Sequence, residues 1–319
     1  MRGLKSAAAA AMLATLARAA HPHGIGPQAT AGPIALEIVL LALMIASAVG
    51  YAIGVTRLWR RAGVGRGINA HEVFRFACGW GVLAAALLPP IDTLADGSFA
   101  LHMVQHELLM VVAAPLLVAS RTFEAWAWAL RGGGVGALAA AARGWRWLAT
   151  PWRSWWLHAA ALWLWHVPAF FDAALDNLAI HALQHLSFLG SALMFWWAVY
   201  GRGIRAREGS VFAALLTTML HMNALGLLLT FAPASWYAHG HAFTLGMTAL
   251  EDQQLGGLLM WMLGSLAYLG AALAVIAAWM APRQRPDKAA GADAATGLLA
   301  PLQANWTSAA GTAADLRPG

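Results

Sequence analysis

The stretch LHMVQHELLM, residues 101–110, decides the fold class, because it places two histidines and a glutamate inside a long apolar run. That run has about the 20 apolar residues that a transmembrane helix requires. Six more runs of similar length predict an all-α protein, a polytopic membrane bundle of seven transmembrane helices. The seven expected spans are 34–56, 71–91, 98–119, 155–175, 178–200, 210–232 and 254–281.

Composition supports a membrane protein. Of the 319 residues, 60% are apolar and 11% are charged, and the mean hydropathy is +0.61. The sequence pI is about 10.2, but the arginines fall between the apolar runs, so membrane topology explains them and no nucleic-acid partner is expected. The single cysteine, Cys78, excludes an intrachain disulfide and a cysteine-based metal knuckle. A metal would have to bind histidine, methionine or carboxylate ligands.

Basic residues alternate between the connections. The connections after the first, third and fifth runs and the C-terminal tail carry arginines, whereas DTLADGS, DN and PASWYAHGHAFTLGMTALEDQQ carry no arginine or lysine. The positive-inside rule therefore predicts an N-terminus outside and a cytoplasmic C-terminus. We expect a multi-pass protein of the bacterial plasma (inner) membrane.

Three other regions flank or interrupt the expected membrane domain, 33–281. Residues 1–20 have the basic start and the Ala/Leu-rich centre of a signal segment. The Arg- and Trp-rich connection 120–153 predicts helices that lie along the cytoplasmic interface. The Ala/Gly/Pro-rich tail, 286–319, predicts disorder.

A divergent repeat joins the second and third spans and the fourth and fifth spans. Its copies are LLPPIDTLADGSFALHMVQHELLM, residues 87–110, and WHVPAFFDAALDNLAIHALQHLSFL, residues 165–189. Each contains proline, then two aspartates, then the motif His-x-x-Gln-His. We interpret the repeat as a helical hairpin that is duplicated in parallel orientation.

Each copy carries two histidines four residues apart, so both rings lie on one helix face about 6 Å apart along the axis. In the predicted orientation both pairs lie in the outer leaflet. Because polar side chains in hydrocarbon cost free energy, their clustering at one depth indicates a functional site. The predicted metal ligands are His102, His106, His181, His185, His166 and His221. The residues expected to support them are Gln105, Gln184, Asp252 and Glu107.

Glu107 follows the second histidine of its pair, whereas metalloprotease chemistry requires H-E-x-x-H with the base between the ligands. Two roles stay open for it, a proton-relay carboxyl and a structural hydrogen-bonding group. The sequence shows no P-loop, nucleophile elbow or dinucleotide fingerprint in a suitable strand-to-helix context. We therefore expect no enzymatic activity.

The available ligand types favour copper. Imidazoles with thioethers and no thiolate suit copper, whereas imidazole with carboxylate suits zinc, and the Irving–Williams order favours copper where both are present. The thioethers that accompany the histidines belong to Met103, Met110, Met219, Met222 and Met247.

Four segments resemble, in this order, the seven-helix CtaG family of cytochrome c oxidase assembly factors: HMVQHELLMVVAAPLLV, HALQHLSFLGSALMFWW, HMNALGLLLTFAPASWY and EDQQLGGLLMWMLGS. The resemblance covers about residues 33–280. It implies a plasma-membrane protein that helps to assemble the copper-containing terminal oxidase, with oxidase subunits, periplasmic copper chaperones and the lipid bilayer as partners. The matching positions are His102, Gln105, His106, His181, His185, His221, Asn223, Asp252, Gln253, Gln254, Gly256 and Gly257.

These observations predict a protein that holds copper between its third and fifth spans and passes it to an oxidase subunit. Two alternatives stay open. Histidines on facing membrane helices also ligate haem, so a haem-binding electron-transfer protein fits the pattern. Glu107 and the mid-membrane His221 fit a copper or proton transporter.

Overall fold

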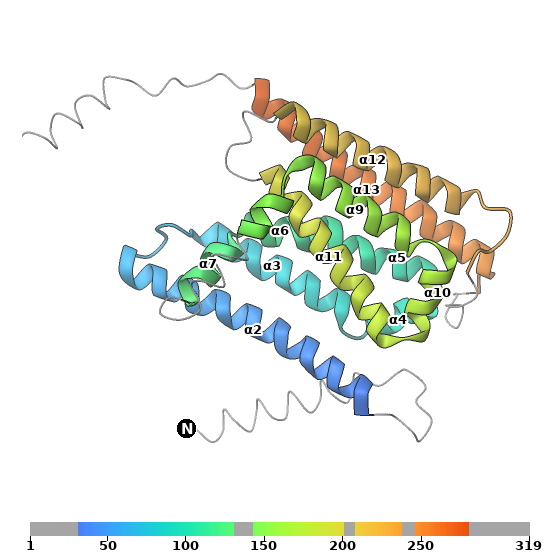
Figure 1. Cartoon of the computed structure of the whole chain (residues 1–319), viewed down its shortest axis with the longest axis horizontal. Coiled ribbons are helices and arrows are strands. Elements are labelled where there is room, and N and C mark those ends of the chain that lie inside the picture. Colours follow the sequence, from blue (N-terminus) through green and yellow to red (C-terminus); the bar gives the residue numbers. More distant parts are fainter. Residues whose placement is uncertain (1–30, 131–142, 201–207, 238–245, 281–319) are drawn as a thin grey trace, which may run out of the picture. The chain divides into compact units, whose positions relative to one another are not determined.

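The structure is a computed structural model that describes residues 31–130, 143–200, 208–237 and 246–280. The regular elements in these ranges are all helical, which confirms the all-α prediction (Figure 1). They are α2 Ala31–Ala62, α3 Ala70–Leu87, α4 Ile91–Gly97, α5 Phe99–Glu107, η1 Leu108–Ala113, α6 Ala114–Ala119, α7 Thr122–Ala129, α9 Pro151–Trp165, α10 Pro168–Asp176, α11 Leu178–Tyr200, α12 Glu208–Thr230 and α13 Ala249–Met280. The expected signal segment, 1–20, and tail, 286–319, lie outside the described residues.

Several helices are long and apolar enough to cross a membrane. In the described part of the chain five qualify: Ile38–Ala62, Phe99–Ala119, Leu178–Tyr200, Gly209–Thr230 and Ala249–Met280. The pair α3 and α4, bent by 42° at its junction, gives a sixth if it counts as one span. The expected span 155–175 is divided into α9, of 15 residues, and α10, of 9. The seventh span and the orientation of the termini therefore stay predictions.

Prolines break the second and fourth expected spans. Pro89 and Pro90 lie between α3 and α4, and Pro168 begins α10 two residues after His166 ends α9. Proline lacks a backbone N–H and its ring clashes with the preceding turn, so a regular helix does not continue through it. Both copies of the repeat thus have one plan: a long helix, a proline break, a short helix, and a helix with the His-x-x-Gln-His motif.

Polar side chains cap the two histidine-bearing helices. At the start of α5, Ser98 Oγ accepts a hydrogen bond from the N–H of Leu101. At the start of α11, Asn177 Oδ1 accepts hydrogen bonds from the N–H groups of Ala179 and Ile180. Such caps satisfy N–H groups that have no partner within the helix. Each histidine pair is therefore carried by a helix with a well-defined beginning.

The third expected span widens into the π-helix η1. Pro115 has no N–H, and the N–H of Ala114 bonds to the Leu109 carbonyl, one residue further back than in an α-helix. The carbonyl of Met110 is thereby left without a helical donor. Trp196 of α11 supplies one, with Nε1–H donating at 2.8 Å. The π-helix thus ties the third expected span to the fifth.

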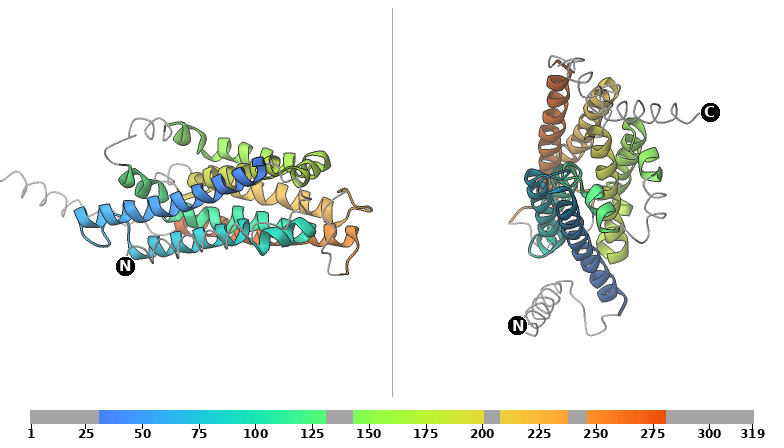
Figure 2. Two further views of the ribbon diagram at one scale, coloured as in Figure 1. Left: turned by 90° about the horizontal axis from the view of Figure 1, so that it is seen from below. Right: turned by 90° about the vertical axis from the view of Figure 1, so that its left-hand side faces the viewer.

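Two clusters of buried apolar side chains form the core. Among the described residues, one joins α5, α9, α10, α11, α12 and α13, the other joins α2, α3 and α7, and η1 and α6 contribute to both. Helix α7 packs closely on α2 (Figure 1, Figure 2). A Cβ atom at Gly54 would lie 1.8 Å from the Ala125 carbonyl oxygen, so this approach requires glycine. Part of the expected interfacial connection, 120–153, is therefore a helix packed on the first span.

Candidate metal centre

Four histidines from two helices form one cluster. Within α5 the ring centroids of His102 and His106 lie 4.3 Å apart, and within α11 those of His181 and His185 lie 4.3 Å apart. Between the helices, the His102 centroid lies 5.4 Å from that of His181. The His106 centroid lies 5.4 Å from that of His185. The structure thus brings together the two pairs, with equivalent histidines of the repeat opposite each other.

Three of these histidines can ligate one metal ion. One ring nitrogen from each of His102, His106 and His185 lies within 4.8 Å of the others. Metal–nitrogen bonds are about 2.0–2.1 Å long, so two imidazole ligands of one ion are at most about 4.2 Å apart. Small side-chain rotations therefore close the three rings around an ion. His181, which stacks on His102, lies next to this group.

The cluster is buried, and several of its ring nitrogens have no hydrogen-bond partner among the described residues. His102 and His106 are 1% and 2% exposed, and His181 and His185 are 7% and 9% exposed. Among the described residues no hydrogen-bond partner meets either nitrogen of His106 or Nε2 of His185. A buried polar atom without a partner costs about 1–3 kcal/mol. A cation bound by these nitrogens would remove that cost.

Aromatic side chains enclose the cluster. The Phe171 ring of α10 lies 5.1 Å from the His102 ring, and the Phe188 ring of α11 lies 4.6 Å from the His106 ring. Phe171 packs in turn on Tyr237, with 4.5 Å between the centroids. An apolar shell of this kind controls the access of water to a metal site. The cluster therefore has the surroundings of an enclosed site.

The two glutamines of the repeated motif make different contacts. Gln105 Nε2 donates to the Ala86 carbonyl at 2.7 Å and to Asp92 Oδ1 at 2.9 Å. Its amide nitrogen therefore ties α5 to α3 and α4 and does not hold an imidazole. Gln184 of α11 instead interacts with His102 on the facing helix. Of the two glutamines expected to support an imidazole, Gln184 is therefore the one that lies beside a histidine of the cluster.

Asp252, expected beside the metal ligands, caps α5 from α13. Its carboxylate accepts hydrogen bonds from Ser98 Oγ at 2.8 Å and from the N–H groups of Phe99 at 2.7 Å and Ala100 at 3.1 Å. Gly256 allows the close approach, because a Cβ atom there would lie 2.5 Å from the Phe99 ring. A carboxylate at a helix N-terminus is stabilised by the free N–H groups and the helix dipole. Asp252 therefore holds the beginning of α5, the helix that carries His102 and His106.

His166, at the end of α9, adjoins the cluster. It interacts electrostatically with His102 and His106. Its Nδ1 lies 2.6 Å from the Leu162 carbonyl oxygen, and its Nε2 lies 3.4 Å from Met103 Sδ. Met103 is one of five methionines that the sequence offers as thioether ligands. No spacing rule singles it out, because His166, which it contacts, lies on another helix.

His221 belongs to a different part of the core. Its ring lies 5.6 Å from that of Trp155, and it interacts electrostatically with His158. His158 has Nδ1 3.1 Å from Ser191 Oγ and Nε2 3.0 Å from the Tyr268 hydroxyl. The sequence did not single out the buried group of His158, Ser191 and Tyr268, because these three residues lie on three different helices. His221 is therefore not placed with the other predicted ligands.

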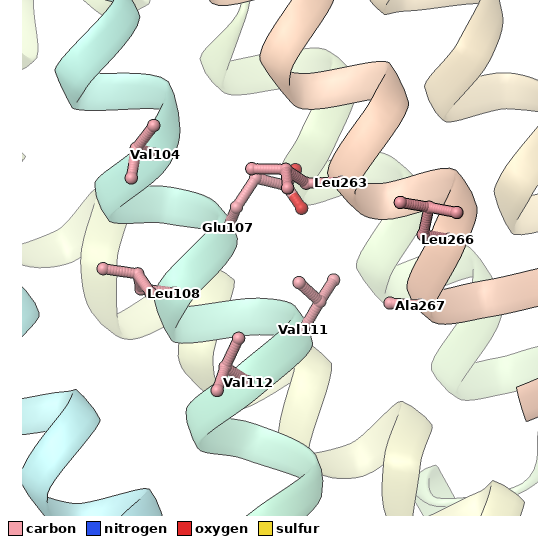
Figure 3. Close-up of a pocket in the computed structure, with 8 residues that line it drawn as sticks. All are labelled: Val104, Glu107, Leu108, Val111, Val112, Leu263, Leu266 and Ala267. Carbon is pink, nitrogen blue, oxygen red and sulfur yellow. The ribbon is translucent and has the colours of Figure 1, made fainter. Parts of the chain in front are cut away.

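Glu107 points into a cavity between the α5–η1 segment and α13 (Figure 3). The cavity has a volume of about 410 Å³, and its other lining residues are apolar: Val104, Leu108, Val111, Val112, Leu263, Leu266 and Ala267. Glu107 is 2% exposed, and neither carboxylate oxygen has a hydrogen-bond partner among the described residues. The described contacts thus supply no structural hydrogen bond for Glu107, and a proton-relay role stays open.

Comparison with known proteins supports the resemblance noted in the sequence. A family model described as "Cytochrome c oxidase caa3 assembly factor (Caa3_CtaG)" matches residues 49–282, a region that includes both histidine-bearing helices. Searches of curated proteins and of solved structures each give no match. The several apolar helices agree with a multi-pass membrane protein, and the oxidase family agrees with a location in the bacterial plasma membrane. This chain therefore belongs to the Caa3_CtaG family of cytochrome c oxidase assembly factors.

Proposed function

We propose that this assembly factor holds copper at the histidine cluster and supports maturation of the copper centre of its oxidase. The observation that carries the proposal is the convergence of His102, His106 and His185, whose ring nitrogens lie within 4.8 Å of one another. Family membership supplies the broader role in oxidase assembly. Copper is the cargo, which the protein binds and releases, so no residue is assigned a catalytic role.

The donor set suits copper. Neutral imidazole binds both copper and zinc, and copper binds more tightly at a given nitrogen site. Within the described residues, the group of three contains no carboxylate. Calcium and magnesium bind through oxygen ligands, so these ions would find no suitable donors in it.

The position of the cluster suits delivery from one side of the membrane. His102 is the fourth residue of α5, and His181 is the fourth residue of α11. At about 1.5 Å of rise per residue, both lie roughly 5 Å inside the beginning of their helices. The distribution of arginines predicts that these ends face outward. Copper from the outer side would therefore travel a short distance to the cluster and could pass laterally to an oxidase subunit.

Haem fits this arrangement less well. Axial histidines bind haem iron from opposite faces of the porphyrin, so the macrocycle has to separate the two rings. Between the helices, the ring centroids are 5.4 Å apart for both pairs of equivalent histidines, and His102 and His181 are stacked at an interplanar angle of 20°. A porphyrin would have to push α5 and α11 apart.

The test is metal analysis with an optical spectrum of the purified full-length protein. We expect the wild type to retain about one copper ion per chain after anaerobic loading, and the His102→Ala/His106→Ala variant to retain less than about a tenth of that amount. His71→Ala is the matched control, because His71 is exposed and lies on α3 outside the cluster. Unchanged copper in the double variant would contradict the site, and a Soret band would indicate haem.

A further inference from the structure

We propose that Met103 and His166 form a second ligand pair beside the histidine cluster, and that this pair makes the protein select copper(I). The inference rests on the proposed function and deepens it, because it names the oxidation state of the cargo. It also assigns a thioether ligand that the spacing of residues in the sequence does not single out.

Two metal-binding atoms from different helices meet at this pair. His166 Nε2 and Met103 Sδ face each other at 3.4 Å. Met103 lies on α5 between the two histidines of that helix, and His166 ends α9. Both residues are buried, at 1% and 5% exposure. Bonds of about 2.0 Å to nitrogen and 2.3 Å to sulfur place two such ligand atoms roughly 3.5 Å apart at a tetrahedral angle. The observed separation of 3.4 Å is close to this value.

The opposite side of the His166 ring shows which nitrogen carries the hydrogen. Nδ1 lies 2.6 Å from the Leu162 carbonyl oxygen, and since a carbonyl can only accept, Nδ1 is the donor. A neutral imidazole has one N–H, so Nε2 presents a lone pair. The thioether of Met103 carries no hydrogen and also presents lone pairs. The two atoms therefore face each other as acceptors, and a soft cation between them would convert this contact into two bonds.

The backbone of His166 is held as well. The Tyr237 hydroxyl donates to the His166 carbonyl at 2.9 Å. The hydrogen bond from Nδ1 to the Leu162 carbonyl and the hydrogen bond from Tyr237 thus hold His166 in place. Both contacts leave Nε2, the nitrogen proposed to bind the metal, free of a hydrogen. Metal-ligating histidines commonly use the other ring nitrogen in this way, because that hydrogen bond sets the tautomer and the orientation of the ring.

The pair extends the histidine cluster with a ligand of different chemistry. His166 interacts electrostatically with His102 and His106, and Met103 lies between those two residues on α5. Imidazoles alone bind zinc, copper, iron and nickel, whereas a thioether favours copper(I). Met103 thus supplies the discrimination that the three histidines lack. Copper(I) could move between the pair and the cluster without leaving the buried site.

The test compares Met103→Leu with the control Met260→Leu in purified full-length protein loaded anaerobically with copper(I). Met260 of α13 is 2% exposed and Met103 is 1% exposed, and leucine has a similar volume, so both variants make a comparable change to the core. Copper K-edge absorption should show a sulfur scatterer at about 2.3 Å in wild type and in the control, and none in Met103→Leu. In a chelator competition, Met103→Leu should weaken copper(I) binding about ten-fold or more. Zinc(II) affinity should stay within about two-fold, which also checks that the variant folds.

The possible outcomes test the Met103–His166 pair separately from the proposed function. Copper bound by nitrogen alone in the wild type, and still lost in His102→Ala/His106→Ala, would overturn the pair and leave the proposed function intact. Sulfur scattering that persists in Met103→Leu would also overturn the pair. A wild-type protein that binds no copper would overturn both. His166→Ala should lose the same sulfur scatterer, because the pair needs both residues to hold the ion.

Discussion

The two copies of the repeat follow one plan but differ in the burial and the course of their histidine helices. In the first copy the histidines are 1% and 2% exposed, and the helix passes into the π-helix η1 directly after Glu107. In the second copy the histidines are 7% and 9% exposed, and α11 runs as one helix of 23 residues. Equivalent sequence motifs therefore lie in unequal surroundings.

The copies also differ in the residues that hold them. The beginning of α5 is capped by Ser98 from its own loop and by Asp252 from α13, a residue far away in the sequence. The beginning of α11 is capped by Asn177 from its own loop. A tertiary contact thus holds the beginning of α5 in the first copy, whereas a local contact holds the beginning of α11 in the second copy. We expect equivalent substitutions to have larger effects in the first copy.

The largest expected difference concerns copper affinity. His106→Ala should weaken copper binding about 100-fold or more, which corresponds to about 2.7 kcal/mol, because it removes one of the three converging ligands. His181→Ala should weaken it about ten-fold or less, because His181 lies beside that group and supports His102. Chelator competition on the two purified variants measures both values. Equal losses would mean that the two copies contribute equally to the site.

Stability should respond unequally to the loss of the two caps. Asp252→Ala leaves three donors at the beginning of α5 without their shared acceptor, and we expect a loss of about 2–3 kcal/mol in unfolding free energy. Asn177→Ala should cost only about 1 kcal/mol, as is usual for a local N-cap. Equilibrium unfolding in mixed micelles compares the two variants. A larger loss of unfolding free energy for Asn177→Ala would show that the second copy, and not the first, depends more strongly on its cap.

The two glutamines should separate stability from metal binding. Gln105→Leu removes a donor to Ala86 and Asp92, so it should lower the unfolding free energy by about 1–2 kcal/mol and leave copper affinity nearly unchanged. Gln184→Leu removes a neighbour of His102, so it should reduce copper affinity by up to about ten-fold at nearly unchanged stability. Unfolding and copper titration on both variants are required. The same profile for both would show that the glutamines are equivalent.

The smallest expected effect lies at the proline break of the second copy, where Tyr237 donates to the His166 carbonyl. Burial, and then the nearby carboxylate of Asp172, raises the pKa of Tyr237. Because an unfolded tyrosine has a pKa of about 10, this stabilisation is complete below about pH 10 and declines as the pH rises further. Tyr237→Phe should cost about 1 kcal/mol at neutral pH. It should also make unfolding less sensitive to alkaline pH, and a variant with the wild-type alkaline profile would contradict this.

The sequence by itself determined the features that belong to a single helix. The apolar runs predicted a helical membrane protein, and the four-residue spacing of the histidines placed each pair on one face, because both properties depend only on helical periodicity. It also carried the repeat, whose proline breaks appear in both copies of the structure. Average hydropathy does not show where a proline divides a helix. The run 155–175 was therefore predicted to be one span, but it forms the two helices α9 and α10.

Only the tertiary structure decided which polar side chains meet. It selected His185 over His181 to complete the group of three, turned Gln105 toward Ala86, and brought Met103 against His166. Each contact joins two elements and depends on how far each helix is rotated and shifted against its neighbour. Packing of apolar side chains across the helices sets those rotations and shifts, and the residue spacing along any one helix does not contain that information.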